Sequence, residues 1–173
     1  MKPARCVLAI VLLSVAGLNN KASAQHLVFL FAHASYDVPV DKDFKNNYTY
    51  GLGAEGGVGL GTGRTFFTGT IGYTQFEANP GKGVNNLSYV PVKIGFRHYL
   101  LIGKVLFINA DAGIGTITDR VTHTSQSRFT ADIGPGVKLG PFEAILNYDG
   151  FTRSDPSGYA SWLAFKIGWR IGL

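Results

Sequence analysis

Few side chains in this sequence combine the types and spacing that catalysis needs. His123, with Ser125 and Ser127 beside it, supplies the atoms for a serine nucleophile and its base. All three lie in one polar segment, however, and a catalytic triad is defined by a geometry that several elements must hold. The four histidines are spread too widely to suggest a metal cluster: His26, His33, His98 and His123. We therefore predict a non-enzymatic protein with no catalytic residue, no cofactor and no metal site.

The segment Gly51–Gly56 matches the G-x-G-x-x-G pattern of dinucleotide-binding proteins. That fingerprint needs a strand before it and a helix after it. Here the glycines continue at every second position through Gly57, Gly59 and Gly61. A period of two indicates a strand, so nucleotide binding is not predicted.

The charge balance does not support nucleic-acid binding. The formal net charge is +5, but Lys2, Arg5 and Lys21 lie in a predicted leader, and their removal lowers it to +2. The rest of the sequence has no basic run that could form an electrostatic footprint. With 13% aromatic and only 16% charged residues, the chain also lacks the composition of a disordered protein.

Most charged residues alternate with apolar ones. The clearest case is the segment 163–173, where every second residue is large and apolar and those between are small or charged. The charges that share the small-residue face are Lys93, Arg97, Arg128, Lys138, Lys166, Arg170, Glu55, Asp111, Asp132, Glu143 and Asp149. Six positive against five negative charges favour ion pairs over a ring of one sign that lines a pore.

Tight turns predict the partners of two of these cations. A two-residue turn at Gly140–Pro141 places Lys138 opposite Glu143, and a three-residue turn at 101–103 places Lys93 opposite Asp111. Buried charges without partners would be very costly. We therefore predict a lumen filled by ion pairs, and the residues assigned to it are Lys93, Asp111, Lys138, Glu143, Lys166 and Arg170.

The first 24 residues have the features of a cleavable signal peptide. Lys2 and Arg5 precede the apolar run Cys6–Leu18, and Ala22-Ser23-Ala24 has the small-x-small form that a leader peptidase reads. The run is shorter than the roughly 20 apolar residues that an anchoring helix needs. We predict cleavage after Ala24 and one domain over residues 25–173, which contains no cysteine.

The period of two recurs along the whole of this domain and predicts eight antiparallel strands. Their expected bounds are Gln25–Tyr36, Tyr48–Gly61, Arg64–Glu77, Leu87–Leu100, Lys104–Thr118, Ser127–Leu139, Phe142–Asp149 and Gly158–Leu173. Short turns follow at 62–63, 101–103 and 140–141, and long polar loops at 37–47, 78–86, 119–126 and 150–157. In an up-and-down meander, the short turns and both termini lie at one end and the long loops at the other.

The small residues decide between a soluble and a membrane barrel. A water-facing strand surface of Gly51, Gly53, Gly57 and Gly59 would lose side-chain packing. Turned inward, these glycines make room for long charged side chains in a narrow lumen, and the apolar set then faces lipid. Aromatic residues predict two interfacial girdles, with Tyr73, Tyr148, Tyr159 and Trp162 at the long-loop end and Phe67, Phe142 and Trp169 at the short-turn end.

The sequence resembles the small eight-stranded outer-membrane barrels of the OmpX and OmpA transmembrane-domain kind. The resemblance covers the predicted domain and rests on Tyr89–Tyr99, Asn109–Gly115 and Phe165–Leu173. It implies an outer-membrane location of the Gram-negative type, contact with membrane lipids and lipopolysaccharide, and insertion by the barrel-assembly machinery. The family usually ends in Phe, whereas this chain ends in Leu173.

Three functions are compatible with these predictions. The leading hypothesis is a monomeric membrane structural or surface-interaction protein that presents its four long loops to possible surface ligands. A lipid A-modifying enzyme and a small-solute channel are the alternatives. The lumen discriminates between them, because ion pairs across its axis would close it and an open core would favour transport.

Overall fold

The computed structural model describes residues 28–100, 104–153 and 158–173. The predicted signal peptide, the first three residues of the predicted first strand, the turn at 101–103 and part of the last loop lie outside the described residues. The elements in chain order are β1 (Val28–Pro39), α2 (Lys42–Asn47), β2 (Tyr48–Thr62), β3 (Thr65–Ala78), β4 (Leu87–Tyr99), β5 (Leu106–Asp119), β6 (Ser125–Leu139), β7 (Phe142–Thr152) and β8 (Tyr159–Gly172).

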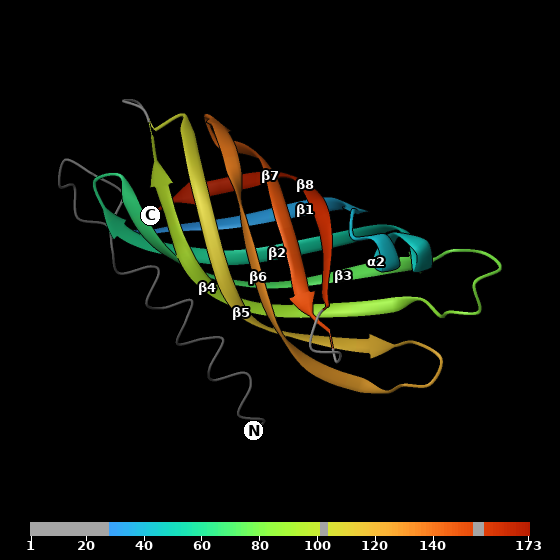
Figure 1. Cartoon of the computed structure of the whole chain (residues 1–173). Helices are drawn as coiled ribbons and strands as arrows, with labels where there is room; N and C mark the ends of the chain where they lie inside the picture. Colours follow the sequence, from blue (N-terminus) through green and yellow to red (C-terminus); the bar gives the residue numbers. More distant parts are fainter. Residues whose placement is uncertain (1–27, 101–103, 154–157) are drawn as a thin grey trace, which may run out of the picture.

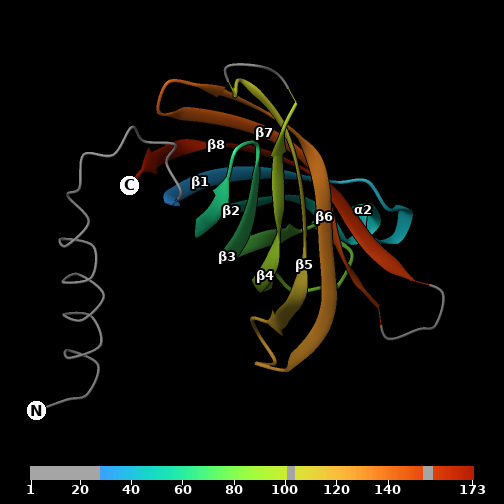
Figure 2. The same cartoon turned by 90° about the vertical axis from the view of Figure 1, so that its left-hand side faces the viewer.

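The eight strands form one closed antiparallel barrel, as predicted. Each strand pairs with the next in sequence, and β8 closes the sheet by pairing with β1 from Phe29↔Gly172 to Pro39↔Trp162. Figure 1 shows this closure where the red β8 runs beside the blue β1, and Figure 2 shows it from the side. Closure removes the free strand edges that an open sheet would expose.

The strands keep the predicted alternation between an apolar outer face and a polar lumen. On β4, Ile94 is 75% exposed, whereas its neighbour Lys93 is 4% exposed. Ile167 and Lys166 on β8 show the same contrast, at 67% and 5%. The apolar side chains therefore lie outside, where a bilayer rather than water must cover them.

Two of the predicted short turns lie among the described residues. Gly63 and Gly140 have φ angles of 64° and 63°, and glycine adopts this left-handed region without steric cost. They join β2 to β3 and β6 to β7 at the end of the barrel that also holds the start of β1. The long loops lie at the opposite end, which we call the loop end.

The first long loop contains a helix that the sequence pattern did not predict. β1 continues to Pro39, beyond its expected end at Tyr36, and α2 follows after two residues. The side chain of Asp41 accepts a hydrogen bond from the Phe44 backbone N–H at 2.9 Å, which caps the helix N-terminus. At the other end, the backbone N–H of Tyr48 donates to the carbonyl of Phe44. This short helix places Phe44 inside the barrel mouth, where it is 5% exposed.

Aromatic clusters fill both ends of the lumen. The cluster at the loop end contains Phe44, Phe76, Leu87, Tyr89, Phe151, Ala160, Trp162 and Ala164. The cluster at the turn end contains Phe29, Phe31, Phe66, Tyr99, Phe107 and Ile145. Inward glycines make room for these rings as well as for charged chains, since a Cβ on Gly59 or Gly136 would collide with Phe29 or Phe107.

One residue of the predicted girdle at the loop end, Trp162, faces the lumen instead of the lipid. Trp162 is 1% exposed and packs against Phe44, Phe76 and Phe151 inside the lumen. It has the parity of Lys166 on β8, and the small side chains of Ala160 and Ala164 flank it on that face. The prediction used only the position of Trp162 near the loop end of the strand and not its parity.

The other predicted girdle residues do not enter the lumen clusters. Tyr73 and Tyr148 are 45% and 47% exposed on the outer face near the loop end. Phe67, Phe142 and Trp169 are more than half exposed near the turn end. The Tyr159 side chain is half-buried, and its hydroxyl donates to the Ala131 carbonyl at 3.0 Å.

Candidate functional site

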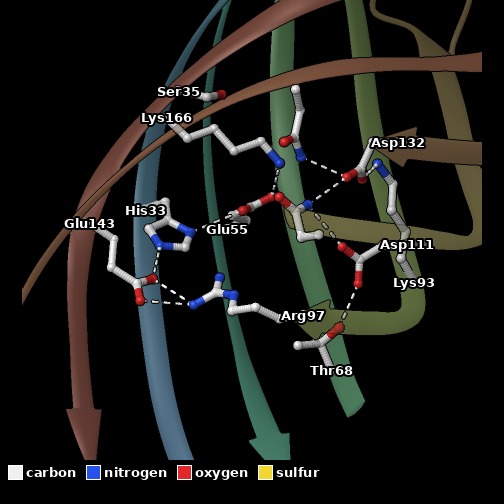
Figure 3. A network of polar contacts seen from close by, with 12 residues as sticks. His33, Ser35, Glu55, Thr68, Lys93, Arg97, Asp111, Asp132, Glu143 and Lys166 are labelled. Carbon is white, nitrogen blue, oxygen red and sulfur yellow. Dashed lines mark hydrogen bonds and ion pairs between the residues drawn. The ribbon is translucent and has the colours of Figure 1, made fainter. Parts of the chain in front are cut away.

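Between the two aromatic clusters lies a layer of charged side chains that meet across the lumen (Figure 3). Glu143 of β7 has a fully buried side chain, and both of its carboxylate oxygens accept from Arg97 Nη1 at 2.8 Å. The Arg97 guanidinium also lies over the Phe107 ring, 4.3 Å from its centroid. This geometry gives a buried cation two charge-assisted hydrogen bonds and a cation–π contact.

His33 joins this ion pair to a second one. Its Nε2 lies 3.2 Å from Glu143 Oε2, and its Nδ1 lies 3.0 Å from Glu55 Oε1. The other oxygen of Glu55 accepts from Lys166 Nζ at 2.7 Å. Both ring nitrogens thus face a carboxylate, and only the imidazolium form donates from both. The chain Arg97–Glu143–His33–Glu55–Lys166 connects five strands across the lumen.

A third group of ionic contacts lies towards the loop end. Lys93 Nζ donates to Asp132 Oδ2 at 2.7 Å and to Asp149 Oδ2 at 2.7 Å. Asn147 and Asn109 donate to the other oxygen of Asp132 at 2.6 and 3.2 Å. The two side-chain amides therefore satisfy the Asp132 oxygen that receives no hydrogen bond from Lys93, as a buried carboxylate requires.

The predicted pair of Lys93 with Asp111 is wrong. The register places Lys93 opposite Gly113, and Asp111 opposite Gly95. The reason is the connection after β4, which is two residues longer than predicted because Leu100 pairs with Leu106. Asp111 instead accepts hydrogen bonds from Thr68 at 2.6 Å and from Asn109 at 3.2 Å.

The predicted register of Lys138 and Glu143 is correct, but their predicted ion pair is not among the contacts. Glu143 turns its carboxylate to Arg97 and His33 across the lumen. Lys138 is only half-buried, so its ammonium retains access to solvent at the turn end. Strand register thus places two backbones side by side without deciding which side chains meet.

The last two predicted lumen residues behave differently from each other. Lys166 forms the ion pair with Glu55 described above. Arg170 instead donates to the Tyr99 hydroxyl at 2.8 Å and lies 3.9 Å from the centroid of the Phe29 ring. Arg170 is therefore held by the turn-end aromatic cluster.

Sequence reasoning missed His33 as a lumen residue. The apolar run at the start of β1 hid the alternation, although His33 has the parity of Phe29, Phe31 and Asp37, which are also buried. Their shared parity was the signal that could have found it. The inward charges Glu55, Arg97, Asp132 and Asp149 were predicted as such, but not as partners.

The segment with the Ser–His atoms lies around the β5–β6 connection. Ser125 Oγ forms a hydrogen bond with Thr118 Oγ1 at 2.8 Å, and His123 adopts a left-handed φ of 54° in an exposed turn. Asp119 orders this turn, and hydrogen bonds from the backbone N–H groups of Thr122 and Val121 hold the pKa of its carboxyl below the ordinary value. Within the described ranges, no group of three or more His, Cys, Asp or Glu side chains could hold a metal ion.

Two internal cavities lie beside the charged layer, both lined in part by Glu55 and Lys166, and have volumes of about 10 Å³ each. A cavity of this size has room for about one water molecule. Asn109 Oδ1 and Asp37 Oδ1, on residues that line them, have no hydrogen-bond partner within the protein. In these two cavities the lumen is thus wide enough for single waters and not for a hydrated ion.

These features define an eight-stranded antiparallel up-and-down transmembrane β-barrel. The sheet is closed, the outer face of the strands is apolar, and the charged side chains of the strands lie in the lumen. A closed barrel satisfies the backbone polar groups that lipid cannot. In the described part of the chain, no helix is long and apolar enough to cross a membrane.

Solved structures of small outer-membrane barrels have the same fold, which confirms the architecture expected from the resemblance. The attachment invasion locus protein Ail of Yersinia pestis aligns with a TM-score of 0.59 at 12% identity, over 85% of this chain and 100% of that one. Neisserial surface protein A aligns with a TM-score of 0.56 at 8% identity, over 84% and 97%. The N-terminal barrel of Pseudomonas aeruginosa OprF aligns with a TM-score of 0.53 at 12% identity, over 83% and 97%. No protein-family model and no curated protein sequence matches the chain.

Proposed function

We propose that this chain is a non-enzymatic outer-membrane protein whose closed barrel holds four loops at the cell surface for interaction with other molecules. The observation that carries the proposal is the filled lumen. Two aromatic clusters enclose a layer in which Lys93, Arg97 and Lys166 each contact a carboxylate. Paired charges between two aromatic clusters leave ions no continuous aqueous path through the barrel. Such a closed barrel is suited to be a scaffold for its loops.

The similar barrels support a role at the surface by their names. One is an attachment invasion locus protein and another is a Neisserial surface protein. For this chain we propose a monomer that contacts outer-membrane lipids and lipopolysaccharide with its apolar face. We also propose export by the signal peptide 1–24 and insertion by the barrel-assembly machinery.

Conductance tests the closed lumen. The purified barrel in a planar lipid bilayer should give no steady current, because the aromatic clusters and ion pairs block both ends and the middle. The double variant Phe44→Ala with Trp162→Ala removes two rings of the loop-end cluster, and we expect the ionic layer to keep it closed. Stable, ion-selective channels from the wild-type protein would contradict the scaffold and favour transport.

Cysteine labelling tests the surface orientation, because the predicted mature chain has no cysteine of its own. Lys82→Cys lies in the exposed β3–β4 loop, and Arg64→Cys lies in the exposed β2–β3 turn at the other end. On intact cells, a membrane-impermeant maleimide should label Lys82→Cys and leave Arg64→Cys unlabelled. After cell lysis both should react. The reverse pattern on intact cells would show that the turns, and not the loops, face outwards.

A further inference from the structure

The loop end carries a cavity of about 330 Å³ between α2 and the ends of the strands. Its floor is apolar and is formed by Phe44, Tyr48, Leu87, Ile117, Phe151 and Ala160. The Phe44 and Tyr48 rings pack at an interplanar angle of 43° with their centroids 4.8 Å apart, and Tyr48 and Ile117 are the half-buried members that remain accessible. The volume is at the lower end of the range of small-ligand pockets.

The rim of this cavity carries polar side chains that are nearly all of one chemical kind. Apart from Thr152, its polar side chains all end in a planar group with two or more polar heavy atoms: Asp43, Asn47, Gln126, Arg128 and Arg153. Carboxylate, amide and guanidinium groups can each bond two adjacent atoms of a ligand at once. A floor of rings below a rim of such groups suits a ligand with one apolar face and polar atoms around its edge.

Contacts among the rim residues hold them in place. Arg153 Nη1 donates to Asp43 Oδ2 at 2.8 Å, and Arg153 also bonds Asp41, the residue that caps α2. Arg128 donates to Gln126 Oε1. At the far end of α2, Asn79 Nδ2 donates to the carbonyls of Lys45 and Asn46 at 3.1 and 2.8 Å. A rim that is ordered before binding lowers the entropy cost of holding a ligand.

We propose that this mouth cavity binds a saccharide. A pyranose ring offers a C–H face for the aromatic floor and vicinal hydroxyls that the planar groups of the rim can bond in pairs. A fatty acyl chain would gain nothing from the polar rim, because it has no polar atoms along its length for these groups to bond. A phosphate or sulfate would face the Asp43 carboxylate beside the two arginines.

Two sources supply such a ring at this end of the barrel. The core sugars of lipopolysaccharide lie in the same membrane leaflet, and free saccharides reach the loops from the medium. The inference deepens the proposed function, because it relies on the loop end facing outwards for either source to meet the site. Binding by the purified barrel does not depend on that orientation, so the two can fail separately.

Saturation-transfer NMR on the folded full-length barrel tests the site, in a detergent without a sugar headgroup. The probes are the methyl glycosides of glucose, galactose, mannose and N-acetylglucosamine. At least one should receive magnetisation from the aromatic floor at millimolar concentration. Purified core oligosaccharide should displace it if lipopolysaccharide is the source, and failure to displace it would assign the site to free saccharides.

Two variants and a matched control locate the binding. Gln126→Ala and Asn47→Ala each remove one planar group from the rim and should weaken binding about tenfold, as the loss of a hydrogen-bonding partner does. Lys82→Ala changes an exposed loop residue outside the cavity and should bind normally. Heat-modifiable gel mobility verifies that each variant is folded. Absence of transfer to all four glycosides, or binding that neither rim variant weakens, would overturn the proposal.

Discussion

Replacing Glu143 by glutamine should destabilise the barrel by about 3 kcal/mol, because it leaves Arg97 as a buried cation without its carboxylate. The side chain of Glu143 is 0% exposed and that of Arg97 is 3% exposed, so water cannot replace the lost partner. His33 also loses the anionic partner of its Nε2. The change preserves side-chain volume and thus isolates the charge.

The magnitude follows from the geometry. Two unit charges about 4 Å apart attract by about 4 kcal/mol at an effective dielectric constant of about 20. Glutamine retains one carbonyl acceptor, so one of the two 2.8 Å hydrogen bonds from Arg97 can persist. Breaking a buried pair from one side costs about 3–5 kcal/mol, and the retained hydrogen bond places this variant at the lower limit.

Urea unfolding of the barrel in detergent micelles or lipid vesicles measures this loss. Trp162 and Trp169 provide the fluorescence signal, since one is buried in the lumen and the other lies on the outer face. With a slope of about 1–3 kcal/mol per molar urea, the midpoint should fall by roughly 1–3 M. Far-UV circular dichroism verifies that the native state is still a barrel.

A double-mutant cycle and a control separate this pair from its neighbours. Arg97→Met combined with Glu143→Gln should cost less than the sum of the single changes, by about 1–3 kcal/mol. Lys138→Gln should cost less than about 1 kcal/mol, because Lys138 is half-buried and Glu143 binds Arg97 instead.

A charge exchange supplies the decisive contrast. If Lys138 were the partner of Glu143, as strand register alone predicts, Lys138→Glu with Glu143→Lys would restore most of the lost stability. The observed contacts predict no rescue, because a lysine at 143 would face Arg97. Rescue by this exchange, or additivity in the cycle, would refute the argument.

Three further predictions concern the outer face, the lumen packing and the leader. Ile94→Arg should cost about 2–4 kcal/mol because it places a charge on the lipid face, while Ile94→Leu should be nearly neutral; equal costs would show that this face does not meet lipid. Gly95→Ala should cost about 1–3 kcal/mol by overpacking, since its Cβ would collide with neighbouring backbone, whereas a Cβ on Gly69 meets only a side chain at 3.9 Å and Gly69→Ala should be tolerated. Intact-mass spectrometry of the exported protein should find Gln25 as the first residue, and retention of residues 1–24 would exclude cleavage after Ala24.

Local pattern was sufficient to predict the number of strands and the direction of most side chains. On β4 and β8 the period of two is unbroken, so Ile94 and Ile167 lie outside and Lys93 and Lys166 lie inside as predicted. The same pattern was blurred at the start of β1, and His33 was missed there. α2 escaped prediction because six residues with one apolar side chain, Phe44, carry no helical period.

Register was predictable only where the turn length could be identified. Gly140–Pro141 forms the expected turn, and Lys138 lies opposite Glu143. The connection after β4 is two residues longer than expected, and that difference moved Asp111 from Lys93 to Gly95. An error of two residues preserves the parity of every side chain while it changes every neighbour.

The sequence by itself determined that this chain is a barrel with an apolar outside and a charged inside, because alternation along each strand separates the two faces and the glycines on the charged face indicate that this face lies in the lumen. Only the tertiary structure decided which charges meet. Arg97 of β4 contacts Glu143 of β7, and Glu143 contacts His33 of β1. No two of these three strands are neighbours in the sheet, so the side chains meet across the lumen. The lumen is narrow, so side chains from opposite walls reach one another. Closure of the whole sheet sets that distance, and no local segment encodes it.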